Sequence, residues 1–185
     1  QEHIRKPLDE VKVVFCGDTR NNMAYAWMYG CAKMGMHFVG WDLKELSPSE
    51  DIVAYCNEVA KETGAVLEFG EDLALLKGAD VIYTDIWVSM GEEAKLAERV
   101  KQLAPYKVTS KVMAATENPK CLFMHCLPAY HDFETLTAQH CKEEGYDIRE
   151  VDDDVFRSKQ SVVFDEAENR MHTIKAVMVA TIGNV

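Results

Sequence analysis

Five short apolar runs, each followed by a stretch with helical periodicity, limit the possible folds of this chain more than any other feature. Strands that alternate with helices are typical of a parallel sheet covered by helices. No internal repeat or low-complexity linker interrupts the alternation. We therefore predict one α/β domain over residues 1–185, with an open, Rossmann-like parallel sheet. The predicted strands lie near residues 11–16, 37–41, 65–69, 80–84 and 121–125.

Two polar segments mark the expected starts of helices. Residues 47–50 (Ser-Pro-Ser-Glu) form a capping-box pattern with proline in the first turn, and residues 165–168 (Asp-Glu-Ala-Glu) precede the last helical stretch. In that last helix, apolar residues recur at helical spacing, so we expect this stripe to pack on the sheet. The stripe consists of Met171, Ile174, Val177, Met178 and Ile182.

Composition indicates a globular domain without a membrane segment. The chain has 185 residues, of which 48% are hydrophobic, and this is enough to bury a core. The longest apolar stretches, such as residues 176–180, are much shorter than the roughly 18 residues of a membrane span. Gln1 does not begin a signal-peptide pattern. We therefore expect a cytoplasmic protein with no membrane partner.

Cysteine spacing and net charge narrow the function classes. The six cysteines include no C-x-x-C pair and lie mostly in apolar segments, which favours reduced core thiols over disulfides or a zinc site. The formal net charge is −11, whereas nucleic-acid binding depends on clustered Lys and Arg. We therefore expect no nucleic-acid partner, no metal and no cofactor.

Three polar loops directly follow predicted strands. Residues 17–22 (Gly-Asp-Thr-Arg-Asn-Asn) follow the first strand, and residues 85–91 (Asp-Ile-Trp-Val-Ser-Met-Gly) follow the fourth. Residues 123–131 (Phe-Met-His-Cys-Leu-Pro-Ala-Tyr-His) place an imidazole beside a thiol where an apolar run breaks at a proline. Ligands of open parallel sheets bind at the carboxyl ends of the strands. We therefore expect these three loops to line one crevice.

Together with residues 165–175 (Asp-Glu-Ala-Glu-Asn-Arg-Met-His-Thr-Ile-Lys), the three loops resemble the carboxyl-terminal, ornithine-binding half of an ornithine carbamoyltransferase. The likeness runs in order from Gln1 to the last helix and covers nearly the whole chain. The family's amino-terminal half carries a Ser-x-Arg-Thr-Arg phosphate loop and a His-Pro-x-Gln motif, and neither occurs in this sequence. The resemblance implies that the carbamoyl-phosphate-binding domain is absent from this chain, which alone would not turn over.

The resemblance also implies a reaction and its partners. The carbamoyl group of carbamoyl phosphate passes to the δ-amine of L-ornithine, giving citrulline and phosphate. An acidic domain is poorly suited to hold a dianion, so we expect the phosphate site in the other half. The family is usually a homotrimer or a multiple of trimers. Residues 130–149 resemble the longer form common in enzymes of arginine catabolism.

By resemblance, four side chains act at the carbamoyl group. Asp85 and Cys126 flank the δ-amine, with Asp85 as an electrostatic partner and Cys126 accepting or relaying a hydrogen bond. His125 hydrogen-bonds the carbamoyl oxygen, where charge develops in the transition state, and Arg170 adds a positive charge near it. The backbone of Cys126 and Leu127 also faces the carbamoyl group. These groups are needed because an amine protonated near neutral pH must be desolvated and oriented before it attacks.

Other residues are expected to set the identity of the amine. By resemblance, Asn22, Ser89 and Met90 hold the α-amino and carboxylate groups of ornithine. Asn21 is an equally good helix cap, so the sequence leaves open which of the two asparagines reaches the ligand. The loop that contains Ser89 and Met90 resembles ornithine enzymes more than putrescine or aspartate enzymes.

Each assignment has a purely structural alternative. Asp85 could serve only as a turn former after a strand, and Asn22 only as a helix cap. Arg170 could pair with Glu166 on the surface. His125 and its cysteine neighbour could simply fill the core.

The sequence disfavours two other function classes, a cysteine hydrolase and a nucleotide-binding module. Adjacent residues on one strand point to opposite faces, which disfavours a Cys126–His125 ion pair and hence a cysteine hydrolase. A nucleotide-binding module would need a G-x-G-x-x-G pattern after the first strand, and residues 17–22 do not provide it. The remaining alternatives are a carbamoyltransferase for another amine and a non-catalytic binding or interaction domain.

Overall fold

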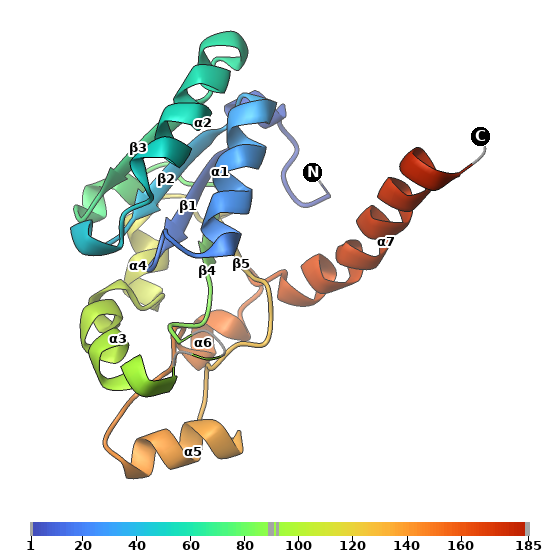
Figure 1. The fold of residues 1–185 in the computed structure, drawn as a ribbon. Helices are drawn as coiled ribbons and strands as arrows, with labels where there is room; N and C mark the ends of the chain where they lie inside the picture. Colours follow the sequence, from blue (N-terminus) through green and yellow to red (C-terminus); the bar gives the residue numbers. More distant parts are fainter. Residues whose placement is uncertain (1, 89–90, 92, 184–185) are drawn as a thin grey trace.

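The computed structural model describes residues 2–88, 91 and 93–183. Its centre is a sheet of five parallel strands in the order β3-β2-β1-β4-β5 (Figure 1). The order reverses next to β1, as in doubly wound Rossmann-like sheets, so the predicted fold class is confirmed. Each strand lies within one residue of its predicted range. The strands are β1 (Lys12–Cys16), β2 (His37–Trp41), β3 (Val66–Gly70), β4 (Val81–Thr84) and β5 (Leu122–His125).

Alternate side chains of the strands enter two hydrophobic cores, one on each face of the sheet. Phe15 and Tyr83 lie in the core covered by the helices that follow β1 and β2, whereas Val14 and Ile82 lie in the core on the opposite face. Short helices cover that opposite face (Figure 1). The covering helices are α1 (Asn22–Met34) and α2 (Glu50–Thr63) on one face, and α4 (Ser110–Ala115) and α6 (Asp153–Phe156) on the other.

The alternation of strands and α-helices fails at one connection. We expected helical periodicity after every strand, but the chain between β3 and β4 forms a 3-10 turn at Leu73–Leu76 and no α-helix, and all of its residues are described. Four apolar or small residues are too few for an α-helix of useful length. Other 3-10 turns are Leu8–Glu10, Lys44–Leu46, Glu93–Lys95 and Ala104–Tyr106, and the remaining α-helices are α3 (Leu96–Leu103), α5 (Leu136–Glu143) and α7 (Val163–Ile182).

The register of the central strands brings their carboxyl ends to one level. Cys16 at the end of β1 pairs with Thr84 at the end of β4, and Thr84 pairs with His125 at the end of β5. The loops that follow these three strands therefore start side by side along one edge of the sheet. The polar loops identified in the sequence are the segments that begin at this edge.

The predicted capping box at residues 47–50 does not form. Helix α2 begins at Glu50 with Ser49 as its N-cap, and the Ser49 side chain accepts no capping hydrogen bond. Ser47 instead donates to Asp42 Oδ1 over 3.4 Å. Pro48 therefore lies before the helix rather than in its first turn. The Ser47 hydroxyl, which the pattern predicted to cap the helix, instead hydrogen-bonds to the buried Asp42 carboxylate.

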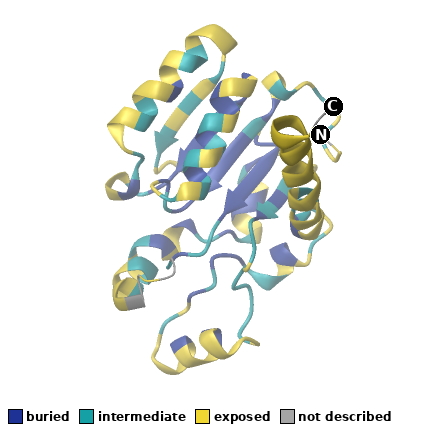
Figure 2. Ribbon diagram, turned by 45° about the vertical axis from the view of Figure 1, so that its right-hand side comes forward, coloured by how far each residue is buried: buried dark blue, intermediate teal, exposed yellow. Residues whose placement is uncertain are grey.

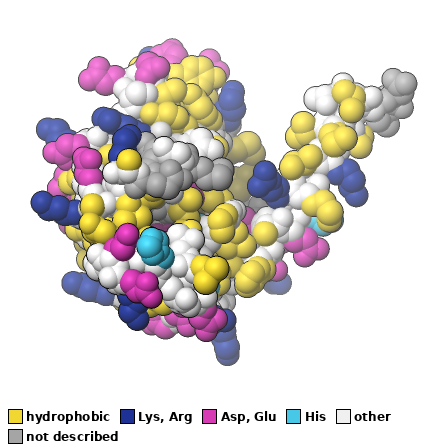
Figure 3. Space-filling view, turned by 60° about the horizontal axis from the view of Figure 1, so that its bottom comes forward, with side chains coloured by type: hydrophobic (Ala, Val, Ile, Leu, Met, Phe, Trp, Pro, Cys, Tyr) yellow, Lys and Arg dark blue, Asp and Glu magenta, His cyan; other side chains and the backbone are white. Residues whose placement is uncertain are grey.

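The apolar stripe of α7 does not face the sheet, contrary to our expectation. Its members Met171, Ile174, Val177, Met178 and Ile182 are between 49% and 75% exposed. Only the first residue of the helix, Val163, belongs to a buried cluster. The helix extends away from the body of the domain (Figure 1) and is exposed over most of its length (Figure 2), with hydrophobic side chains on its visible surface (Figure 3).

Five of the six cysteines are buried, as expected of core thiols, and Cys126 is half-buried. Across residues 2–88, 91 and 93–183, the structure contains no helix with the length and apolar character of a membrane span.

Candidate active site

The loop after β1 is fixed by a buried carboxylate at the end of β2. Thr19 donates its hydroxyl to Asp42 and lies 3.1 Å from the Leu46 carbonyl. Burial raises the pKa of Asp42 to about 6, despite the hydrogen bond from Thr19. On the outer side of the loop, Arg99 Nη1 lies 2.9 Å from Asp18 Oδ2. These contacts fix the path of the chain just before α1.

Asn21, rather than Asn22, points toward the other loops. Its side-chain oxygen accepts a 2.7 Å hydrogen bond from the Ala24 N–H and so caps α1, while its Nδ2 lies 3.3 Å from Asp85 Oδ2. Asn22 is exposed as the first residue of α1. Of the two asparagines that the sequence left open, the structure places Asn21 in the candidate site.

Asp85 joins the three loops. Its Oδ1 accepts a hydrogen bond from its neighbour Ile86 N–H at 2.8 Å and another from Cys126 Sγ at 3.1 Å, and its Oδ2 accepts from Asn21. The predicted convergence of the loops after β1, β4 and β5 is therefore found in the structure. A carboxylate has about four acceptor positions, so these three donors leave one for a further donor such as an amine.

The Cys126 thiol is a hydrogen-bond donor and not a thiolate. Burial, followed by the negative charge of Asp85 and the bond to it, raises the pKa of Cys126 to about 12. Since the thiolate is the nucleophile in cysteine enzymes, a thiol with this pKa is unsuited to covalent catalysis near neutral pH. The raised pKa of Cys126 therefore argues against a cysteine hydrolase.

His125 is completely buried, and both of its ring nitrogens form hydrogen bonds. The Leu127 N–H donates to Nδ1 over 3.0 Å, so Nδ1 carries no proton; the proton on Nε2 then points to Glu150 Oε1 at 3.1 Å. The predicted contact of His125 with a carbamoyl oxygen stays a prediction. In this arrangement the imidazole has no free donor for it.

Glu166, near the start of α7, connects two of the strand ends. Its Oε1 accepts from the Tyr83 hydroxyl and its Oε2 from the His125 N–H, each at 3.0 Å. Burial raises the pKa of Glu166. The structural alternative that paired Glu166 with Arg170 on the surface is wrong, because no ion pair joins these two described residues.

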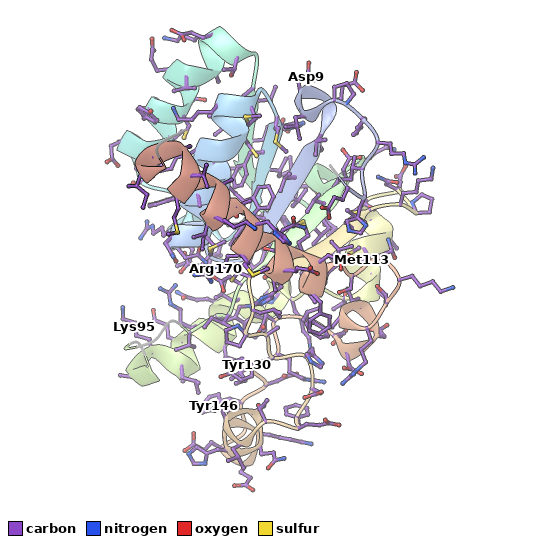
Figure 4. All side chains as sticks on the ribbon, turned by 90° about the vertical axis from the view of Figure 1, so that its right-hand side faces the viewer. Asp9, Lys95, Met113, Tyr130, Tyr146 and Arg170 are labelled. Carbon is purple, nitrogen blue, oxygen red and sulfur yellow. The ribbon has the colours of Figure 1, made fainter. Side chains whose placement is uncertain are left out.

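Arg170 does not approach the site. It is exposed, and its guanidinium has no hydrogen bond or ion pair with any residue of the described part of the chain. The sequence interpretation put it in the first turn of the last helix, but α7 begins at Val163, so Arg170 lies beyond that turn, on the projecting helix (Figure 4). Its role stays a prediction, and Ser89 and Met90 lie outside the described residues.

Within the described residues, two groups of side chains have the composition of metal ligands. Asp85, His125 and Cys126 place one ligand atom each within 4.8 Å of one another. His125, however, could bind an ion only after losing one of its two hydrogen bonds. In the second group, Arg157 Nε lies 2.8 Å from an acidic member and supplies a positive charge. That group consists of His131, Asp132 and Asp153.

The sequence analysis did not predict that Glu150, Glu166 and Tyr83 hydrogen-bond near the candidate site. Glu150 and His125 are separated by 25 residues, and Glu166 lies 41 residues from the backbone N–H that it accepts from. A glutamate in an irregular segment gives no periodic signal, so no pattern in the sequence marks Glu150 as buried. Tyr83 sits in a predicted strand, where an aromatic residue is usual.

Comparison with known proteins identifies the family. The model of the family "Aspartate/ornithine carbamoyltransferase, Asp/Orn binding domain" matches residues 9–181. The catabolic ornithine carbamoyltransferase of Clostridium perfringens is 62% identical over 186 residues, which cover 99% of this chain and 56% of the relative. Ornithine carbamoyltransferase 1, catabolic, of Staphylococcus epidermidis is 48% identical with the same coverage of both chains.

Solved structures agree with the sequence relatives. The ornithine carbamoyltransferase from Pyrococcus furiosus superposes with a TM-score of 0.78 at 37% identity, over 95% of this chain and 50% of that chain. The chain thus spans about half the length of the relatives that it matches. It belongs to the aspartate/ornithine carbamoyltransferase family, of which it forms the Asp/Orn-binding domain.

Proposed function

We propose that this domain is the ornithine-binding half of an ornithine carbamoyltransferase, which transfers the carbamoyl group of carbamoyl phosphate to the δ-amine of L-ornithine to give citrulline and phosphate. The observation that carries the proposal is the contact between Asp85 and Cys126, which lies where the loops after β1, β4 and β5 meet. Ornithine carbamoyltransferases from two bacteria match the whole length of this domain.

The geometry suits a substrate amine. The δ-ammonium of ornithine would take the remaining acceptor position of Asp85, and the carboxylate would offset the cost of removing the cation from water. The amine must become neutral before attack, because an alkyl ammonium has an ordinary pKa near 10. We assign Asp85 the role of orienting the amine, and Cys126 the role of fixing the Asp85 carboxylate through its thiol proton.

The phosphate of the second substrate needs positive charge that this domain does not concentrate. The net charge is −11, and Arg170 is the one predicted basic site residue. We therefore propose that a second, carbamoyl-phosphate-binding domain completes the site in the whole protein, with trimers of that protein in the cytoplasm. A catabolic role is proposed from the names of the similar proteins of Clostridium perfringens and Staphylococcus epidermidis.

The test is citrulline formation from carbamoyl phosphate and ornithine. The 185-residue chain would be assayed beside a longer version extended upstream of Gln1. Activity in the longer version alone is the expected result. Activity in both would show that the phosphate groups lie within this chain and that the proposed division is wrong. Activity in neither would contradict the proposed function.

A further inference from the structure

Glu150 and His125 are buried side chains that connect to the backbone of the candidate site. Both side chains have 0% exposure, so neither touches a substrate from this position. Glu150 Oε1 lies 3.1 Å from His125 Nε2, and the Leu127 N–H donates to His125 Nδ1 over 3.0 Å. One continuous line of hydrogen bonds therefore runs from Glu150 to the peptide that joins Cys126 to Leu127.

We propose that Glu150 is a positioning residue of the site, which fixes His125 in the tautomer protonated on Nε2 and thereby orients the Cys126–Leu127 peptide. The N–H and C=O groups of a trans peptide point in opposite directions. Since the N–H of this peptide faces the buried imidazole, the Cys126 carbonyl faces away from it; the thiol of the same residue contacts Asp85. The proposal rests on the proposed function, because that peptide matters only if the site is catalytic.

The same carboxylate oxygen restrains the far side of the loop. Glu150 Oε1 also accepts a 2.6 Å hydrogen bond from the Tyr130 N–H, so one atom holds both ends of residues 125–130. Between them, Leu127 has a φ of 48°, in the left-handed region that residues with a side chain rarely adopt. A backbone in this conformation persists only where its surroundings restrain it. The two hydrogen bonds to Glu150 supply that restraint directly and through His125.

Glu150 makes its contacts with His125 and Tyr130 through hydrogen bonds to one carboxylate oxygen. Glu150 Oε2 is buried and has no hydrogen-bond partner among the described residues, so only Oε1 makes contacts. Burial raises the pKa of Glu150. A glutamine at this position keeps an oxygen that can accept from His125 and Tyr130. Glu150→Gln should therefore preserve the tautomer, whereas Glu150→Leu should remove it.

The direct test is the protonation of the His125 ring, read from its two nitrogen NMR shifts in this chain. The expected result is an unprotonated Nδ1 and a protonated Nε2 in the wild type and in Glu150→Gln, with a changed pattern in Glu150→Leu. A wild-type ring protonated on Nδ1 would overturn the proposal, and so would an unchanged pattern in Glu150→Leu, because the Leu127 N–H alone would then fix the tautomer. This readout needs no activity, so it separates the positioning role from the proposed function.

Kinetics of the citrulline-forming version test the consequence. Glu150→Leu should lower kcat about 10- to 100-fold with little change in the KM for carbamoyl phosphate, and Glu150→Gln should stay within about 3-fold of wild type. The exposed Glu143→Leu is the matched control. His125→Asn, whose side-chain oxygen can replace Nδ1 as acceptor, should retain more activity than His125→Leu. Equal kcat in wild type and Glu150→Leu would refute the positioning role, as would equal loss in the two His125 variants.

Discussion

At the carboxyl edge of the sheet, Glu150 and His125 are fully buried and bonded to each other, whereas in α7 the apolar side chains of Met171 and Val177 are 61% and 60% exposed. In these two regions the usual distribution is reversed, because polar side chains are buried in the first and apolar side chains are exposed in the second. In the first region, hydrogen bonds from distant segments compensate for burial. In the second, only Val163 at the start of the helix joins a buried cluster, and polar contacts such as the one between Asn169 and Glu2 follow it.

The difference shows what a periodic pattern can and cannot predict. The spacing of the α7 stripe correctly predicts an amphipathic helix, but it says nothing about which surface, if any, covers the apolar side. The polar loops carry no periodic signal, yet their position after strands predicts that they meet, because parallel strands share an edge. Topology was therefore a better guide to the site than hydrophobic pattern was to the packing of the last helix.

The largest expected effect is on the free energy of unfolding, and it comes from comparing a buried isoleucine of the sheet with an exposed isoleucine of α7. Ile82 in β4 has 0% exposure and Ile182 at the end of α7 has 75%. Ile82→Ala should lower the free energy of unfolding by about 2–5 kcal/mol, since it removes buried methyl groups and leaves a cavity. Ile182→Ala should change it by less than about 0.5 kcal/mol. Urea denaturation of both variants measures this, and equal losses would show that α7 is packed on the domain in solution.

A second prediction concerns the pH dependence that Asp42 gives to the first loop. Burial raises its pKa from 3.8 to about 6, so the folded state binds this proton more tightly than the unfolded state. The stabilisation is complete below the ordinary pKa and is lost as the pH rises toward about 6, up to about 3 kcal/mol in all. The neighbouring carboxylates of Asp18 and Glu71 add to the shift.

Asp42→Asn removes this titration, so the free-energy difference between wild type and variant should change between about pH 4 and pH 6 and stay constant above about pH 7. Denaturation curves at several pH values measure that difference. A pH-independent difference would show that the pKa of Asp42 is not raised in the folded state.

The smallest expected effect is a difference in stability between variants of the two neighbouring asparagines at the start of α1. Asn21 caps α1 through the Ala24 N–H, and Asn22 is exposed. Asn21→Ala should cost about 1 kcal/mol of stability, and Asn22→Ala should be close to neutral. Thermal unfolding of the two variants gives the comparison. A larger loss for Asn22→Ala would contradict the assignment of Asn21 as the N-cap of α1.

Much of the fold was predictable because strands and their following loops leave local signals. Apolar runs located the five strands to within one residue, and chain order then brought Asp85 and Cys126 to one edge. The partners of His125 were not predictable in the same way. Glu150 comes from an irregular segment 25 residues away, and its burial depends on packing that no local pattern records.

Two local signals were misleading for physical reasons. The capping-box pattern before α2 lost its serine to the buried Asp42, because a tertiary hydrogen bond replaced the local one. Arg170 was expected to point toward the strand ends, but it is an exposed residue of α7 (Figure 4), a helix that extends away from the body of the domain (Figure 1). In both cases the sequence identified the correct element, and tertiary structure decided where the side chain lies.

The central claim is that the Asp85 carboxylate, fixed by Cys126 and Asn21, orients the amine of the substrate. Steady-state kinetics of Asp85→Asn in the citrulline-forming version test it most directly, with the exposed Asp9→Asn as the matched control. We predict a fall of about 100-fold in kcat/KM for ornithine, little change in the KM for carbamoyl phosphate, and wild-type kinetics for the control. An Asp85→Asn enzyme as active as Asp9→Asn would contradict the account.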